Sequence, residues 1–154
     1  YCQDPEATEK VLKDGWLYTG DLGKVDNEGF FYITGRKKNV IVTKNGKNIY
    51  PEELEASLNK SLYILESLVW GKNVEGSDET IVCAKIVPNF EAISNKLGLE
   101  NPPEEEIHKI IKAEVKAVNK SLPMYKRIHE FSIRYEEFEK TTTRKIKRYL
   151  ENQQ

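Results

Sequence analysis

The chain has 154 residues, of which 38% are hydrophobic and 32% charged, as expected for one globular domain with a modest core, or a small domain with an extra segment. Lysine and arginine (24) nearly balance aspartate and glutamate (25), which argues against a surface that binds nucleic acid. The two cysteines and two histidines form no motif, so we expect neither a disulfide scaffold nor a metal site, and we place the protein in the reducing cytoplasm.

The start of the chain is polar and acidic and has no initiator methionine. It does not resemble a signal peptide, and no apolar run in the chain approaches the roughly 20 residues that cross a bilayer. We therefore expect the chain to be a segment of a longer protein.

The first 36 residues predict one helix and one hairpin. Asp4 is suited to cap a helix, with Pro5 at its first position. The expected elements are a helix over residues 5–13, ended by Asp14-Gly15, and strands within 16–25 and 30–34. These elements bury too little apolar surface to offset their ordering entropy, so we expect them to be the edge of another domain.

From about residue 38 the pattern predicts a complete α+β domain. The long helix is indicated by isoleucines and valines at helical spacing. The expected order is a short hairpin over 40–43 and 47–50, a helix from 51, strands over 64–74 and 80–87, helices over 90–97 and 102–122, a strand over 128–135 and a helix over 145–150. This order predicts a small mixed sheet flanked by helices, preceded by a β-hairpin remnant of a larger domain.

Three short segments have residue types suited to a nucleotide, and each has a plain alternative. Asp21 follows a glycine at a strand start, where a carboxylate can approach ligand hydroxyls or cap a turn. Residues 36–38 are three cations that suit a phosphate or ribose, or form a solvated turn. Residues 141–148 place hydroxyl groups before a basic stretch, which either aims a lysine at a phosphate or is a frayed terminal helix. Taken singly, each segment favours its plain alternative.

The order and spacing of these segments are more specific than any one of them. Together with the opening Asp4-Pro5, the segments 18–21, 35–38, 46–55 and 141–148 resemble the closing motifs of the adenylate-forming (AMP-binding) superfamily. That superfamily contains acyl-CoA synthetases, luciferases and the adenylation domains of peptide synthetases. The resemblance covers essentially the whole chain, and residues 35–55 are most similar to the long-chain fatty acyl-CoA synthetase (fatty-acid–CoA ligase) branch.

The resemblance implies an ATP-dependent acid–thiol ligase. Such an enzyme activates a fatty or other carboxylic acid as acyl-AMP and transfers the acyl group to coenzyme A. ATP, Mg²⁺ and coenzyme A are then substrates of the full-length enzyme. Residues 1–36 are expected to end its large N-terminal adenylation domain, and residues 37–154 to be its mobile C-terminal domain. The acyl pocket and most of the adenine site would belong to the large domain.

The resemblance also assigns roles to individual residues. Many members have glycine at the position of Arg144 and proline at the position of Glu139. The expected roles are catalysis for Lys145, contact with the ATP ribose for Asp21 and Arg36, the domain hinge for Lys38, and the coenzyme A channel for Thr43 and Gly46.

Alternatives to this interpretation stay open at the level of the sequence. The acyl acceptor would be a carrier protein rather than coenzyme A in an acyl-AMP ligase or a carrier-loading adenylation domain. A stand-alone α+β interaction module without catalysis is a third reading. An upstream Ser/Thr/Gly-rich phosphate loop ending in lysine would exclude that module. Peripheral membrane association of the full-length enzyme also stays open, whereas nucleic acid is not expected as a partner.

The chain alone is expected to bind ATP only weakly, because most nucleotide contacts would lie in the large domain. Isothermal titration of the 154-residue chain with ATP and Mg²⁺ should detect no tight complex. A micromolar dissociation constant for the chain by itself would contradict this expectation.

Overall fold

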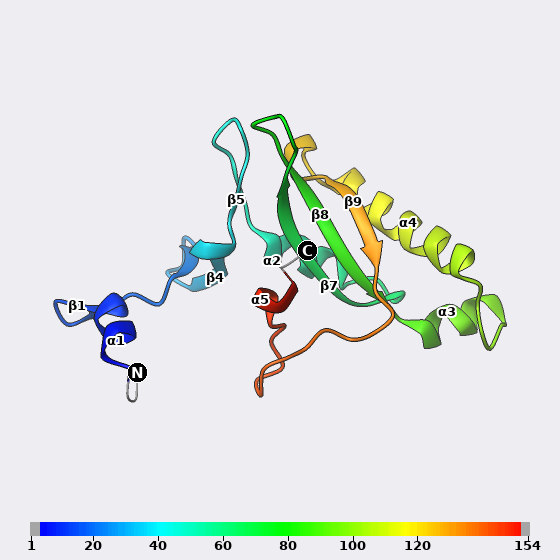
Figure 1. Ribbon diagram of the computed structural model, residues 1–154, viewed down its shortest axis with the longest axis horizontal. Helices are drawn as coiled ribbons and strands as arrows, with labels where there is room; N and C mark the ends of the chain where they lie inside the picture. The colour runs from blue at the N-terminus through cyan, green and yellow to red at the C-terminus, as the bar shows by residue number, and fades with distance from the viewer. Residues whose placement is uncertain (1–3, 152–154) are drawn as a thin grey trace.

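A three-stranded mixed sheet lies at the centre of the computed structural model, which describes residues 4–151 (Figure 1). β7 (Ile64–Asn73) pairs antiparallel with β8 (Thr80–Pro88), and β9 (Ile128–Ile133) pairs parallel with β8 on its other side. A parallel neighbour needs a crossover connection, and α3 (Phe90–Leu97) and α4 (Glu104–Ser121) provide it. The expected α+β class with a small mixed sheet is confirmed.

One hydrophobic core joins this sheet to α2 (Pro51–Leu58) and α4. α4 directs a stripe of apolar side chains inward at the spacing of an amphipathic helix. These buried residues are Ile107, Ile110, Ile111 and Val115. Leu54 and Leu58 of α2 and Ile86 of β8 are almost completely inaccessible to solvent. The core therefore lies wholly within the segment from residue 41 onward.

Local signals in the sequence explain the boundaries of the helices. α2 begins at Pro51 and has two glutamates in its first turn, where the helix dipole favours negative charge. In α3, the Asn89 side chain accepts a hydrogen bond from the Ala92 amide at 3.2 Å. α3 ends at Gly98, whose φ of +66° suits a residue without a Cβ. Its bounds agree with the expected helix over residues 90–97.

The N-terminal segment forms α1 (Pro5–Val11), two very short strands and one longer hairpin. The short strands are β1 (Leu12–Lys13) and β2 (Trp16–Leu17), and the longer hairpin consists of β3 (Asp21–Val25) and β4 (Phe31–Arg36). The Asp4 carboxylate caps α1 by accepting from the Ala7 amide at 2.9 Å, as predicted. The helix does not reach residue 13, because Asp14 and Gly15 have φ values of +52° and +79° and form a hairpin turn.

Residues 12–33 expose an unusual number of large apolar side chains. Trp16 is 74% exposed, Phe31 85% and Ile33 79%. In Figure 1 this segment extends away from the sheet, and α1 buries no residue of its own. Contiguous apolar exposure of this extent is typical of a surface that binds another protein, a membrane or a ligand.

The end of the chain differs from the expected helix over residues 145–150. α5 (Arg148–Glu151) begins three residues later, and an isolated antiparallel bridge joins Lys140 to Ile146. Arg144 has a φ of +59°, in the left-handed region, which a continuous right-handed helix excludes. Lys145 therefore lies on the arm of a small hairpin. Within residues 4–151, no helix is both long and apolar enough to span a bilayer.

The core and the exposed hairpin face should respond differently to the same substitution. Ile86→Ala empties part of the core and should lower the free energy of unfolding by about 2–5 kcal/mol. Ile33→Ala, at a position that is 79% exposed, should change it by less than about 0.5 kcal/mol. Urea unfolding followed by circular dichroism measures both, and equal losses would contradict this account of the core.

Candidate functional site

Asp21 and Arg36 lie directly opposite each other at the open end of the β3–β4 hairpin. Arg36 Nε and Asp21 Oδ1 are 2.7 Å apart, and the side chains are 48% and 29% exposed. Gly20, with a φ of +74°, turns the chain into β3, and its carbonyl accepts a hydrogen bond from the Lys37 amide at 2.9 Å. The hairpin thus presents a carboxylate and a guanidinium side by side, a pair able to bind vicinal hydroxyl groups.

Lys38 is exposed in a single 3₁₀ turn, η1 (Lys37–Asn39), which connects the N-terminal hairpin to the core. The next residue, Asn39, donates a hydrogen bond to Glu52 Oε1 at 2.7 Å and so ties the end of the turn to α2. Gly35, before the turn, is buried against the same side chain: a Cβ added there would lie 2.7 Å from Glu52 Oε2. That oxygen is buried and has no hydrogen-bond partner among the described residues.

Thr43 and Gly46 are at the tip of the hairpin formed by β5 (Ile41–Val42) and β6 (Asn48–Ile49). The Gly46 amide donates to the Thr43 carbonyl at 2.8 Å, and Gly46 has a φ of +72°. The Lys47 ammonium lies 4.4 Å from the centre of the Tyr125 ring, which connects this tip to the segment before β9. Gly46 leaves the outer side of the tip free of side-chain bulk.

Lys145 lies on the second arm of a small hairpin spanning residues 139–147. The Thr141 amide donates to the Lys145 carbonyl at 2.8 Å, and the Lys147 amide donates to the Glu139 carbonyl at 2.8 Å. These bonds fix the backbone of the hairpin. The Lys145 side chain is exposed, and across residues 4–151 we find no hydrogen bond or ion pair to its ammonium.

The base of this hairpin is held by buried contacts. Phe138 is 3% exposed and packs with Leu68 and Val87 of the sheet, and Ile146 packs against the same cluster. The Lys140 ammonium contacts the Glu66 carboxylate and lies 2.8 Å from Glu137 Oε2. The backbone that bears Lys145 is therefore anchored to the sheet while its side chain stays in solvent.

α5 is fastened to the core by two sets of ion pairs. Arg148 binds Glu55 of α2, and Glu151 lies 3.0 Å from Lys85 Nζ and 2.6 Å from Arg134 Nη1. Burial raises the pKa of Glu55 above its ordinary value even though the Arg148 charge opposes this effect. Burial also acts to raise the pKa of Glu151, but its two cationic partners outweigh burial and the pKa is lowered.

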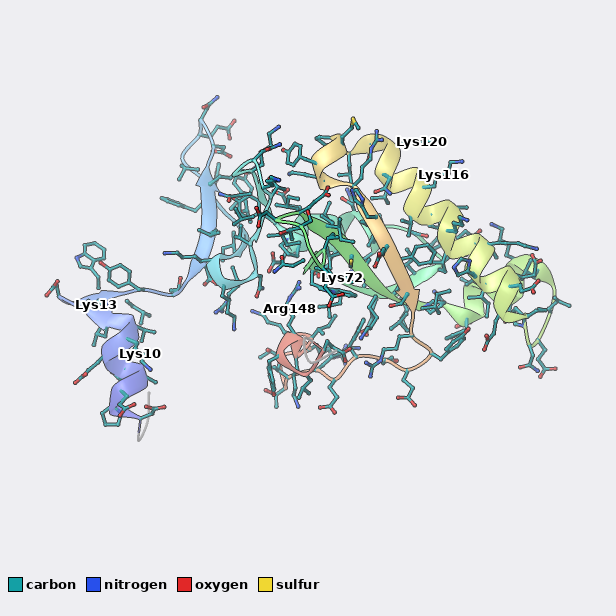
Figure 2. All side chains as sticks on the ribbon, turned by 45° about the horizontal axis from the view of Figure 1, so that its top comes forward. Lys10, Lys13, Lys72, Lys116, Lys120 and Arg148 are labelled. Carbon is teal, nitrogen blue, oxygen red and sulfur yellow. The ribbon has the colours of Figure 1, made fainter. Side chains whose placement is uncertain are left out.

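A hollow of about 540 Å³ separates α5 from the 3₁₀ turn at Lys38. Its walls include Lys38, Trp70, Lys72 and Arg148. Figure 2 shows Arg148 directed from α5 toward the sheet, with Lys72 nearby. Lys72 is paired with Glu130 Oε2 at 3.0 Å and Arg148 with Glu55, so most of the positive charge around this hollow is already neutralised.

The predicted site residues thus fall into separate groups. Asp21 and Arg36 form one contact. The Thr43–Gly46 tip and the Lys145 hairpin lie at opposite ends of the domain in the view of Figure 1. Sequence reasoning assigned no role to Glu55 or Arg148, because two residues 93 positions apart give no local signal of their contact. Among the described residues, no group of three or more His, Cys, Asp or Glu side chains is placed to hold a metal.

This fold and arrangement of motifs define the small C-terminal domain of adenylate-forming enzymes. The model of the family described as AMP-binding enzyme C-terminal domain matches residues 38–153, and the chain belongs to this family. The fold is also that of solved relatives. The adenylation domain of a Mycobacterium chelonae carboxylate reductase superimposes with a TM-score of 0.79 at 23% identity, covering 97% of this chain and 23% of that one.

Curated relatives and a second solved structure are CoA ligases. A long-chain-fatty-acid–CoA ligase of Bacillus subtilis is 48% identical over 81 residues, which are 53% of this chain and 14% of the relative. An indoleacetate–CoA ligase of Aromatoleum aromaticum is 46% identical over 57% of this chain and 17% of the relative. The o-succinylbenzoate CoA synthetase of Bacillus subtilis, solved with its acyl-adenylate intermediate, has a TM-score of 0.71 at 26% identity. It covers 99% of this chain, which spans 27% of that one.

Arg144 should be a strained position, because its φ of +59° is costly for a residue with a Cβ. The left-handed conformation costs such a residue about 1–2 kcal/mol. Glycine at this position would remove that cost, but its greater conformational freedom in the unfolded chain offsets about 0.5–1 kcal/mol of the gain. Arg144→Gly should therefore raise the free energy of unfolding by about 0.5–1 kcal/mol in urea denaturation.

Arg144→Ala is the matched control, since it removes the same charge but keeps the Cβ. It should give no gain beyond about 0.5 kcal/mol. An equal stabilisation by alanine and glycine would show that charge, and not backbone conformation, limits stability here.

Proposed function

We propose that this chain is the C-terminal part of an ATP-dependent acyl-CoA synthetase, and that Lys145 acts in the step that forms the acyl-adenylate. The observation that carries the proposal is the Lys145 hairpin: a hydrogen-bonded backbone that presents a long cationic side chain to solvent, in a domain of the adenylate-forming family. The curated relatives span CoA ligases for long-chain fatty acids, indoleacetate and 2-succinylbenzoate.

The proposed chemistry has two displacement steps. In the first, a carboxylate oxygen of the acid attacks the α-phosphorus of ATP, the bond to the β-phosphate oxygen breaks, and pyrophosphate leaves. In the second, the thiolate of coenzyme A attacks the acyl carbon, AMP leaves, and the thiol proton passes to solvent or to a base. Negative charge gathers on the α-phosphoryl oxygens in the first step, and the Lys145 ammonium would stabilise it electrostatically.

Asp21 and Arg36 are proposed to bind the ribose of the nucleotide. The Asp21 carboxylate accepts hydrogen bonds from hydroxyl groups, and the Arg36 guanidinium, 2.7 Å away, donates to them and holds the carboxylate in place. We also propose that a large partner domain covers Trp16 and Phe31, because residues 12–33 expose an apolar face.

The two steps are proposed to use opposite ends of this domain. Lys145 serves the first step, and the Thr43–Gly46 tip lines the path of coenzyme A in the second. Since these groups lie far apart in Figure 1, a single orientation against a fixed nucleotide cannot present both. A rotation about Lys38, exposed in its short 3₁₀ turn, would exchange them.

We further propose a fatty acid as the acid substrate. The resemblance of residues 35–55 to the long-chain branch supports this proposal, as do the several curated relatives that are long-chain-fatty-acid–CoA ligases. A cytoplasmic location fits such an enzyme. The competing acceptor is the phosphopantetheine arm of a carrier protein, and assaying the full-length enzyme with coenzyme A and with a holo carrier protein distinguishes the two.

Lys145→Ala in the full-length enzyme should slow adenylate formation about 100- to 1000-fold, because one preorganised charge at the α-phosphate is lost. Thioester formation from supplied acyl-adenylate should stay within about twofold of wild type. Pyrophosphate release and single-turnover thioester assays measure the two steps separately.

Lys147→Gln is the control, since it removes a cation two residues away whose partner, Glu139, is 67% exposed. It should leave both steps within about twofold of wild type. Equal slowing of both steps by Lys145→Ala would contradict the use of two orientations.

A further inference from the structure

The outer edge of β7 is occupied at Val69 by two side chains from distant parts of the chain. β8 pairs with β7 on one side only. On the other side, the Val69 amide donates to Glu55 Oε1 at 2.7 Å, and the Val69 carbonyl accepts from Arg148 Nη1 at 3.0 Å. Free backbone groups at a sheet edge are normally paired or covered. Glu55 and Arg148 here take the place of a neighbouring strand.

The same two side chains bind each other. Arg148 Nη2 donates to Glu55 Oε1 at 2.6 Å and also contacts Oε2. Their side chains are only 22% and 13% exposed, so water competes weakly for these bonds. Because the guanidinium is a rigid fork, one group can reach the Val69 carbonyl and the Glu55 carboxylate at fixed angles. A lysine carries its three donors on a single nitrogen and lacks the planar fork whose separate nitrogens bond Val69 and Glu55 here.

Arg148 lies three residues after Lys145, where the hairpin meets α5. Its own amide donates to the Ile146 carbonyl at 3.0 Å, and Ile146 packs near the buried Phe138. Before Lys145, the chain is held to the sheet by Phe138 and Lys140. After it, Ile146 packs against the same cluster and the Lys147 amide bonds to the Glu139 carbonyl, and Arg148 then fastens the chain to Val69 and Glu55. The position of the Lys145 backbone is therefore set from both sides.

We propose that Arg148 is a positioning residue for Lys145, and that its guanidinium fixes the backbone from which Lys145 reaches the nucleotide. The inference rests on the proposed role of Lys145 in adenylate formation. Arg148 itself contacts Val69 and Glu55, so its loss affects chemistry only through the placement of Lys145. A misplacement of about 1 Å at a catalytic group lowers a rate by about 100-fold.

Hydrogen–deuterium exchange of the 154-residue chain tests the structural half of this proposal. Arg148→Lys should speed exchange of the Thr141 and Lys147 amides, which are bonded within the hairpin, by roughly tenfold or more. Exchange in α4 should not change, and Lys147→Gln should leave the Thr141 amide as in wild type. Unchanged exchange of the hairpin, or equal loss of protection in α4, would overturn the proposal.

The functional half is a double-substitution experiment in the full-length enzyme. Arg148→Lys should slow adenylate formation by about 10- to 100-fold and leave thioester formation from supplied acyl-adenylate within about twofold. In a Lys145→Ala background, adding Arg148→Lys should cause no further loss beyond about twofold, because the group that it positions is already absent.

The possible failures of this experiment are distinguishable. A full additional loss in the Lys145→Ala background, or equal slowing of both steps, overturns the positioning role and leaves the function of Lys145 intact. If Lys145→Ala leaves adenylate formation unchanged, the proposed function of Lys145 is wrong, and the positioning role that rests on it falls too.

Discussion

The free edge of β7 is the constraint around which the second half of this domain is organised. A three-stranded sheet has two edges, and an uncovered edge leaves backbone amides and carbonyls without partners. At Val69 these groups are satisfied by an anion from α2 and a cation from α5, which also neutralise each other. The pair links α2 to α5 and so joins two residues that are 93 positions apart in the sequence.

The buried Glu55–Arg148 ion pair adds little net folding stability. Desolvating a carboxylate and a guanidinium offsets most of their attraction, so an apolar pair of similar volume would often be as stable. Hydrogen bonds have preferred directions, whereas apolar contacts do not. Arg148 can therefore bond both Val69 and Glu55 in only one geometry. A segment that is proposed to place one lysine accurately would gain more from one defined geometry than from additional burial.

Much of the fold follows from local sequence signals. The apolar spacing of α4 predicts that helix, and the strands expected over 64–74 and 80–87 and the helix expected over 90–97 have nearly the observed bounds. Asp14-Gly15 was expected to end a helix but forms a hairpin turn, because the same dipeptide suits both and only the pairing of Leu12 with Leu17 decides.

The candidate site divides in the same way. Asp21 and Arg36 were recognised from motifs, and their contact follows from the register of β3 and β4. The late start of α5 depends on the positive φ of Arg144. Arginine has no preference for this conformation, so the residue type does not predict it. The Glu55–Arg148 contact arises from tertiary packing across the sheet. Long-range polar contacts of this kind have no periodicity, so a sequence read alone does not reveal them.

Glu52 gives the observed orientation of the N-terminal hairpin an energetic cost. Its Oε2 atom is shut away from water beneath Gly35 and finds no partner within the part of the chain described here. Asn39 ends the turn and is bonded to Glu52 of α2, whereas Gly35 lies before the turn. In the rotation proposed at Lys38, lifting Gly35 away would let water reach this oxygen again and would recover about 1–3 kcal/mol of hydration. The contact of Gly35 with Glu52 thus carries a hydration cost that the proposed rotation would relieve.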